Sequence, residues 1–548
     1  MANRIDRRSF LKGLGMAAGW TVVRAATPAA AGLLKGPGGL RGYELVSLAR
    51  VHAPGRRVEA LQERFDLTEH GRNGWFHVVL WPGDRQRLVD EGFTFEILVE
   101  DLVAQDIADR TAELEAQRAA PQERLMYRML SDYENDLQKL AQENPSFVRH
   151  FTLTGTTHEG RRIHGVEIAK DVTRAATDGR PTSLICGLHH AREWPSAELT
   201  MMLAEDIVDE YKKGTARYVN LVDNVRIILL PVVNPDGFVR SRETVSDFIY
   251  PHPIVVQEFA YHRKNMRKNT TALVETGQGV DTNRNYPYMW GGTGSSGTAS
   301  SQTYRGANPG SEPEVVGLLN LFRSNQVLTM ITNHTYSDLV LRPWGHKAAD
   351  PPDEAHLRAL GNAMAAINGY TSQKGIQLYK TNGITEEWVY GAMGGYGYTF
   401  EIGSSQFHPQ YNTTIPGYWS RNRDAFLLCL EAARNTAYHS VLRGAFPPGT
   451  TVGISKAVTI PLDPTGGRGT TYQDAMSSSI VVGDGGSFEW HVNPSPLPET
   501  VDQVNKGGLP ESALEPYRVA VTTPDGVTRT KEIVVLRGRT YEVSFDEE

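Results

Sequence analysis

The stretch SLICGLHHAREWPS, residues 183–196, places four polar side chains at the end of an apolar run. The run 183–188 predicts a buried strand, and Pro195 is typical of the first turn of a helix. Between them stand His189, His190, Arg192 and Glu193. His190 and Glu193 are three residues apart and both can bind a divalent metal ion, although such pairs are also common on solvated surfaces. Packing requires no such cluster, so the stretch indicates a site at the end of a strand.

Segments with strand and helix character alternate from residue 126 to about residue 444. Strand-like apolar runs cover 166–169, 183–188, 226–233, 327–331 and 396–402. Helix-like periodicity covers 196–212, 312–324, 353–367 and 420–438. This alternation predicts an α/β fold in which helices flank a mixed, twisted sheet.

A second histidine, His334, follows the apolar run 327–331. Ligands of open α/β sheets bind beyond the carboxyl ends of the strands, so His334 can meet His190 and Glu193 there. Taken alone, such a residue is more often a hydrogen-bonded structural histidine. Its place at a second strand end favours a third metal ligand.

The first 31 residues resemble a twin-arginine export signal. Arg7 and Arg8 precede a weakly apolar stretch, 14–23, and a small-residue segment that contains Ala29-Ala-Ala31. We therefore predict an exported protein, periplasmic or extracellular. A basic, disordered N-terminus is the alternative. Elsewhere no run of 18 apolar residues occurs, so we expect no transmembrane segment.

Two smaller regions flank the segment 126–444. Residues 32–125 predict a small αβ unit followed by a charged helical connector, 99–123, which we expect to be exposed. Residues 445–548 are rich in Gly, Thr, Ser and Pro with short alternating stretches, which predicts a small antiparallel β-domain. This last region carries no catalytic constellation, so we expect it to serve packing or attachment.

The composition excludes some functions. The net charge is -7 and no basic stripe is present, so we expect no nucleic-acid partner. Cys186 and Cys429 both lie in apolar runs, where buried free thiols are common. We therefore expect neither a disulfide nor a cysteine metal site.

Several ordered motifs between residues 126 and 444 resemble the zinc carboxypeptidases of the carboxypeptidase A/B family. In chain order they are GLHHAREW (187–194), NPDGF (234–238), MRK (266–268), VDTNRN (280–285), HTY (334–336), Tyr379 and TFE (399–401). The resemblance implies that His190, Glu193 and His334 bind one zinc ion per catalytic domain. Neighbouring side chains on a strand point to opposite faces, so His189 is expected to support the site rather than to bind the ion.

The same resemblance implies a metallocarboxypeptidase that acts on peptide or protein C-termini through zinc-activated water. Glu401 matches the general base, and Arg267, in the basic run 263–268, matches the arginine that stabilises the oxyanion. The residues implied to bind the substrate are Arg192, Asn283, Arg284, Tyr336, Tyr379 and Glu386. Glu386 matches the position that faces the specificity pocket and favours a basic terminal residue.

Two other functions remain open on the sequence. One is a zinc peptidase that trims cell-wall peptides, and the other is a non-catalytic binding protein on the same fold. Residues 32–125 resemble the propeptides of the family in size and position. They would then cover the site until cleavage near 118–124, or form a permanent accessory domain. We expect the protein to be a monomer.

Overall fold

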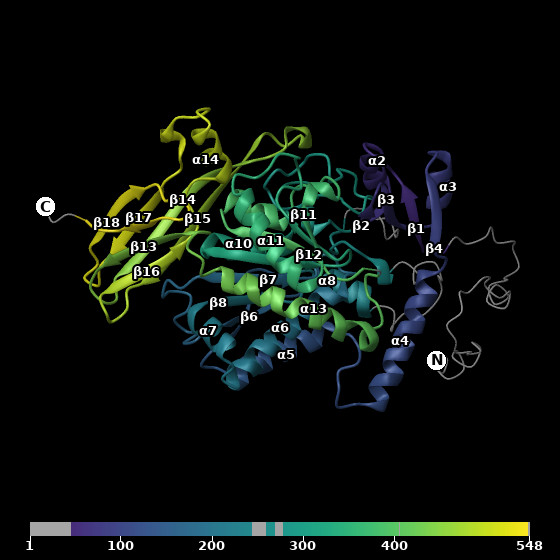
Figure 1. Ribbon diagram of the computed structural model, residues 1–548, viewed down its shortest axis with the longest axis horizontal. Coiled ribbons are helices and arrows are strands. Elements are labelled where there is room, and N and C mark those ends of the chain that lie inside the picture. The colour runs from purple at the N-terminus through teal and green to yellow at the C-terminus, as the bar shows by residue number, and fades with distance from the viewer. Residues whose placement is uncertain (1–44, 244–258, 269–277, 405, 546–548) are drawn as a thin grey trace, which may run out of the picture. The chain divides into compact units, whose positions relative to one another are not determined.

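Eight strands form the central sheet of the computed structural model, which describes residues 45–243, 259–268, 278–404 and 406–545 (Figure 1). The strands are β5 (Val148–Thr152), β6 (His164–Ile168), β7 (Thr182–Gly187), β8 (Arg226–Leu230), β9 (Val327–His334), β10 (Leu339–Arg342), β11 (Thr371–Lys374) and β12 (Tyr396–Glu401). Their order is β11-β10-β12-β9-β7-β8-β6-β5. The four inner strands β12, β9, β7 and β8 are parallel, and antiparallel pairs lie on both sides of them. The predicted α/β fold with a mixed sheet is confirmed.

Long helices cover this sheet. They are α5 (Leu130–Glu143), α6 (Trp194–Lys212), α7 (Ala216–Asn224), α10 (Pro313–Ser324), α11 (Glu354–Asn368) and α13 (Tyr411–Ala432). Helices α6 and α13 pack against β7 and β9, where apolar side chains form one large core. Helix α13 starts nine residues before the predicted start at 420. Its first turns were not predicted, because Pro416 and Gly417 are poor helix formers and interrupt the helical sequence pattern.

The N-terminal αβ unit has its own four-stranded sheet. It contains β1 (Ser47–His52), α2 (Arg57–Arg64), β2 (Asp66–Arg72), β3 (Trp75–Leu80), α3 (Asp84–Asp90) and β4 (Thr94–Val99), with strand order β2-β3-β1-β4. Strand β2 was not expected, because its sequence DLTEHGR has almost no apolar residues. The predicted export signal, residues 1–31, lies outside the described residues.

One face of the connecting helix α4 (Leu102–Ala119) is anchored by the buried side chains Leu102, Asp106 and Glu113, so the connector is only partly exposed. The Asp106 carboxylate lies 3.2 Å from His408 Nε2. Glu113 is fully buried and accepts a hydrogen bond of 2.7 Å from the Tyr411 backbone N–H. Burial raises the pKa of Glu113 to about 7. These contacts fix α4 to the start of α13.

The C-terminal region forms two small sheets. Its elements are β13 (Ser440–Ala445), β14 (Thr451–Pro461), β15 (Thr471–Val481), β16 (Ser487–Val492), α14 (Pro498–Asn505), β17 (Tyr517–Thr522), β18 (Thr528–Ile533) and β19 (Thr540–Glu542). The sheet orders are β16-β13-β19 and β15-β14-β17-β18. The β13–β19 pair is parallel, so the region is not wholly antiparallel. The expected boundary after residue 444 falls inside β13, which belongs to the first of these sheets.

Short helical turns lie between the longer elements. They are α8 (Pro235–Phe238), η2 (Val239–Glu243), η4 (Phe259–Tyr261), η6 (Thr282–Arg284), η7 (Gly375–Gln377), α12 (Thr385–Glu387), η8 (Trp388–Ala392), η9 (Pro464–Gly466) and η10 (Glu511–Ala513). None of the helices in the described ranges is long and apolar enough to cross a bilayer. Cys186 and Cys429 are buried free thiols, as predicted.

Candidate metal centre and substrate pocket

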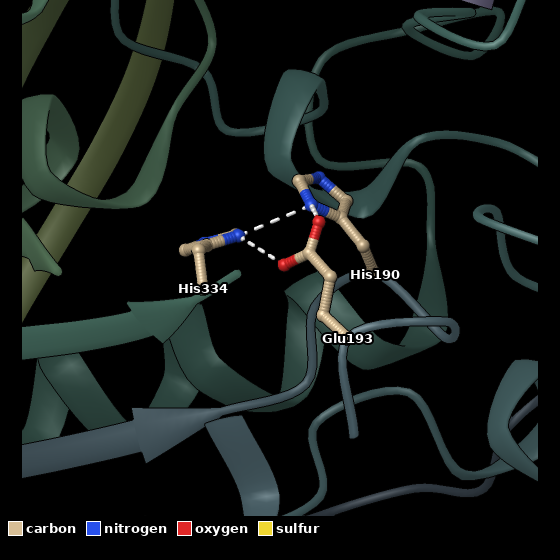
Figure 2. A group of neighbouring side chains, drawn as sticks. All are labelled: His190, Glu193 and His334. Atoms are coloured by element: carbon tan, nitrogen blue, oxygen red, sulfur yellow. Dashed lines mark hydrogen bonds and ion pairs between the residues drawn. The ribbon is translucent and has the colours of Figure 1, made fainter. Parts of the chain in front are cut away.

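Three side chains from two distant parts of the chain converge on one buried point (Figure 2). His190 Nδ1 lies 2.7 Å from Glu193 Oε1, and His334 Nδ1 lies 2.9 Å from Glu193 Oε2. The two Nδ1 atoms are 3.1 Å apart. Each of the three side chains is at most 2% exposed. The predicted set His190, Glu193 and His334 therefore comes together in space.

The strand register brings these residues to one edge of the sheet. His334 is the last residue of β9, and it lies opposite Glu401, the last residue of the parallel strand β12. The adjacent strand β7 ends at Gly187, and the chain turns sharply through Leu188, which has a φ of 59°. Ser196 on α6 holds this turn, because its Oγ accepts from the Leu188 N–H and donates to the Glu193 carbonyl. The tight turn delivers His190 and Glu193 to the carboxyl edge.

The cluster fits a zinc ion. Three ligand atoms about 2.1 Å from a tetrahedral ion lie roughly 3.4 Å from one another, so separations of 2.7 to 3.1 Å require only a small outward movement. His190 Nε2 lies 3.2 Å from Asp281 Oδ1, and such a carboxylate fixes the imidazole with Nδ1 turned to the ion. Burial would raise the pKa of Asp281, but Arg263 and His190 outweigh it and hold that pKa well below its usual range.

His189 is separated from the cluster by its own hydrogen bonds. Its Nε2 lies 3.0 Å from the Tyr286 hydroxyl, and its Nδ1 lies 3.1 Å from Thr332 Oγ1. Its ring stacks on the ring of His334 at 5.7 Å between centroids. His189 therefore supports a ligand, and the adjacent doublet supplies one histidine to the cluster.

Arg263, and not Arg267, lies beside the cluster. Arg263 Nη2 is 3.1 Å from Asp281 Oδ2, and Nη1 is 3.7 Å from Glu193 Oε1. Arg267 instead pairs with Glu312 at 2.6 Å and keeps a third of its side chain exposed. The geometry therefore favours Arg263 over Arg267 for the expected oxyanion role. In a run with arginine at both positions, the sequence alone does not fix which one faces the site.

A pocket opens next to the cluster and brings together most of the predicted substrate residues. It is lined by His190, Asn283, Arg284, His334, Leu341, Gly375, Leu378, Tyr379, Thr381, Ile384, Glu386, Thr399 and Glu401. Arg284 is oriented by hydrogen bonds from Nε to the Gly294 carbonyl (3.0 Å) and from Nη1 to the Asn283 carbonyl (2.8 Å). The Asn283 amide oxygen accepts from the backbone and hydroxyl of Thr385.

The N-terminal αβ unit contacts the remaining predicted substrate residues. Arg192 is fully buried and forms a two-point ion pair with Asp66 of β2, at 2.6 and 2.8 Å. The Tyr336 hydroxyl lies 3.1 Å from His77 Nδ1 of β3. Tyr379 packs in an apolar cluster with side chains of the N-terminal sheet. In this arrangement Arg192 and Tyr336 face the N-terminal unit instead of a substrate.

A second group of possible metal ligands consists of His158, Glu312 and Glu314. Its donors already have partners: Asn265 Nδ2 donates to both carboxylates, at 2.9 and 3.0 Å, and Arg267 pairs with Glu312. Burial raises the pKa of Glu314 to about 7. The Asn265 amide and the Arg267 guanidinium therefore already satisfy the carboxylates of this second group.

Three residues of the site were missed by the sequence interpretation. Arg263 lies in the same basic run as Arg267, to which the sequence pattern assigned the oxyanion role. Asp281 lies inside the motif VDTNRN, but the motif predicted no role for it. Asp66 gave no signal, because one acidic residue in a polar segment predicts no partner.

Comparison with known proteins agrees with this geometry. The sequence model described as zinc carboxypeptidase matches residues 133–425, more than half of the chain. Carboxypeptidase A2 of Rattus norvegicus is 27% identical over 333 residues, which cover 59% of this chain and 74% of that protein. Metallocarboxypeptidase A of Trichophyton rubrum is 32% identical over 269 residues, which cover 47% of this chain and 58% of that protein.

Solved structures agree on the fold. The crystal structure of carboxypeptidase A from Helicoverpa armigera superposes with a TM-score of 0.60 at 21% identity, over 72% of this chain and 99% of that chain. The crystal structure of thrombin activatable fibrinolysis inhibitor gives a TM-score of 0.58 at 19% identity, over 71% of this chain and 98% of that chain.

Replacing Asp281 with alanine should lower the affinity for zinc about 10- to 100-fold, because the His190 ring loses the acceptor that orients it. Competition with a chelator of known affinity measures the change. Asp223→Ala, which removes a surface carboxylate bonded to Tyr211 and Lys170, is the matched control. Equal zinc affinity in the Asp281 variant and the wild type would contradict the role of this carboxylate.

Proposed function

The chain belongs to the zinc carboxypeptidase family, and from this premise we propose that it removes C-terminal residues from peptides or proteins by hydrolysis. The observation that carries the proposal is that a pocket containing Glu401 and Arg284 is also lined by His190 and His334 of the three-ligand cluster. His190, Glu193 and His334 would hold the zinc ion of the family. Bound there, zinc supplies a Lewis acid and brings the pKa of water toward 7.

Two residues act on the scissile bond in this proposal. Glu401 accepts a proton from the attacking water and returns it to the leaving amine, as a general base and then a general acid. The Arg263 guanidinium lies beside Glu193 and stabilises the negative charge that develops on the carbonyl oxygen. The hydrogen bond from the Ala191 N–H to the Arg263 carbonyl supports this placement, because it ties Arg263 to the ligand-bearing turn.

Recognition of a free C-terminus needs a fixed cation at the correct distance from the bond to be cut. A planar guanidinium binds a carboxylate through two parallel hydrogen bonds. Arg284 lines the pocket, with Asn283 next to it, and Tyr379 closes one side. These three residues would hold the terminal carboxylate in the pocket that Glu401 also lines.

The pocket favours a basic terminal side chain. The Glu386 carboxyl is buried, and its Oε2 has no hydrogen-bond partner among the residues that the structure describes. Burial, and then the neighbouring charge of Glu387, raise the pKa of Glu386 to about 7. Gly375, which has no side chain, lines the same pocket as Glu386. A lysine or arginine side chain would fill this space and pair with the buried carboxylate.

The N-terminal αβ unit would restrain the enzyme until it is cleaved. The Asp66 carboxylate pairs with the Arg192 guanidinium in the way that a substrate carboxylate would. Apolar side chains of the same unit also pack against Tyr379. The segment 121–124, just after α4, is exposed and ends in Arg124, which suits a trypsin-like protease. Faster hydrolysis after limited proteolysis near 118–124 is expected if the unit acts as a propeptide.

We also propose export by the twin-arginine route. The proposal rests on Arg7, Arg8 and the small residues up to Ala31. Transport of a folded protein suits an enzyme that acquires its metal before export.

Glu401→Gln should abolish turnover while zinc stays bound, because the amide accepts no proton at neutral pH. The assay compares release of a terminal amino acid with zinc content, and a chelator control is run on the wild type. Glu386→Gln, in the same pocket, should still hydrolyse peptides that end in Phe. Wild-type activity only on D-terminal cell-wall peptides, or none at all, would overturn the proposed function.

Arg263→Ala should lower kcat about 100- to 1,000-fold, the range for loss of one oxyanion-stabilising group. Arg267→Ala should change kcat little, because Arg267 pairs with Glu312 away from the ligands. Steady-state kinetics on one peptide compare the two variants. The reverse order of effects would restore Arg267 to the role predicted from the sequence.

Glu386→Gln should lower the preference for terminal Arg over Phe about 10- to 100-fold, since a charge-assisted contact is worth about 1.5 to 3 kcal/mol. In the wild type, KM for Arg-terminated peptides should rise as the pH falls below about 7, where the Glu386 carboxyl is protonated. KM for Phe-terminated peptides should not follow this change. Equal efficiency for both peptides at pH 8 would remove the proposed preference.

Asp66→Ala should raise the activity of the intact chain at least about tenfold, because it leaves the buried Arg192 without its partner and weakens docking by about 3 to 5 kcal/mol. Glu63→Ala, an exposed carboxylate on α2, is the control. Activity is measured before and after limited proteolysis. If proteolysis also leaves the wild-type rate unchanged, the αβ unit is a permanent accessory domain.

A further inference from the structure

A glycine-rich segment, residues 291–294, runs between two other parts of the chain at very close range. On one side, a Cβ on Gly292 would meet the Asp463 carboxylate at 2.0 Å. On the other side, a Cβ on Gly294 would meet the Lys380 carbonyl at 2.5 Å. Gly291 and Gly294 both have a φ of 107°, which side chains rarely adopt. The segment is therefore confined on both sides.

The side that contains Asp463 is the tip of the hairpin β14–β15 in the C-terminal region. The hairpin pairs from Thr451↔Val481 to Pro461↔Thr471, and its tip consists of residues 462–470. Two backbone hydrogen bonds join it to the chain before Gly291: Met289 N–H to the Pro461 carbonyl (2.8 Å) and Asp463 N–H to the Trp290 carbonyl (3.0 Å).

The hairpin is itself fixed firmly. Side chains of Val458, Ile460 and Met476 belong to the core of the central sheet and its helices. Strand β15 packs beside α10, and Asp474 pairs with Arg323 of that helix at 2.7 Å (Figure 1). The hairpin thus extends from the C-terminal sheets to the central sheet and its helices. These contacts hold its tip in place.

The segment it holds ends at a hydrogen bond to Arg284. The Gly294 carbonyl accepts from Arg284 Nε at 3.0 Å, and it also accepts from Gln62 Nε2 of the N-terminal unit at 3.3 Å. The guanidinium is planar, so fixing Nε fixes the direction in which the other two nitrogens point. The neighbouring Thr293 carbonyl is held by Asn382 Nδ2 at 3.0 Å.

We propose that the tip of the β14–β15 hairpin is a positioning element for the terminal carboxylate: it confines residues 289–294, whose Gly294 carbonyl orients Arg284. This inference rests on the proposed role of Arg284. It assigns the C-terminal region a part in substrate binding, in addition to packing. Asp463, Gly466 and Pro461 are positioning residues, because they act on the substrate through Arg284.

Gly466→Ala tests the proposal. A Cβ at this position would stand 2.6 Å from Gly291 Cα, so the segment 291–294 must move. A misplacement on the order of 1 Å costs up to about 100-fold, so we expect KM for peptides with a free C-terminus to rise about 10- to 100-fold with kcat little changed. Competitive inhibition by free L-arginine should weaken by the same factor.

Gly453→Ala, on strand β14 of the same hairpin, is the matched control, because the atom nearest to its Cβ is the Ser478 carbonyl oxygen at 3.8 Å. The ratio of activity on a peptide acid to activity on the corresponding peptide amide should fall in Gly466→Ala and stay unchanged in Gly453→Ala. A merely structural defect would lower the thermal midpoint and both activities together.

A double-mutant cycle separates positioning from packing. In an Arg284→Ala background, Gly466→Ala should cause no further rise in KM, because the two changes act through one group. Additive effects, or an unchanged KM in the single variant, would overturn the proposal. An inactive wild type would instead overturn the proposed function.

If the Gly466→Ala variant does not fold, the same kinetic measurement on Asp463→Ala tests the proposal. It removes the carboxylate that accepts from Thr465 N–H and Oγ and so loosens the tip. A smaller rise in KM with unchanged kcat supports the proposal, and wild-type kinetics contradict it.

Discussion

The structure depends on the burial of several charged groups at the carboxyl edge of one sheet. His190, Glu193 and His334 are almost fully buried, and Asp281 and Arg263 are buried beside them. Burying ionised groups is costly unless they are paired or bind a metal ion. The parallel register of β7, β9 and β12 concentrates these groups at one edge, and the pairing of Asp281 with Arg263 balances part of the charge. A divalent cation would balance the rest.

Both smaller regions contact residues in or beside the pocket. The N-terminal unit contacts Arg192 and Tyr336 on one side, while the β14–β15 hairpin confines the segment that orients Arg284 on the other. The Gly294 carbonyl accepts hydrogen bonds from Arg284 and from Gln62 of the N-terminal unit. The central sheet carries the three candidate ligands, and we propose that its neighbours control how a substrate terminus is held.

The fold and the ligand set could be predicted because strand ends and ligand spacing leave local signals. His190 and Glu193 share one turn, and His334 ends an apolar run. Arg263 was missed because choosing between two arginines in one basic run depends on packing far along the chain. The anchored face of α4 was missed for a similar reason: Asp106 and Glu113 look solvated until His408 and Tyr411 are known to lie against them.

The location of the metal ion distinguishes a site at His190, Glu193 and His334 from one at the second group of ligands. Anomalous diffraction measured on both sides of the zinc absorption edge would show where zinc binds in crystals of the purified protein. We predict one strong peak about 2.0 to 2.2 Å from the ligand atoms of His190, Glu193 and His334. A peak at His158, Glu312 and Glu314 instead, or no peak in an active protein, would contradict it.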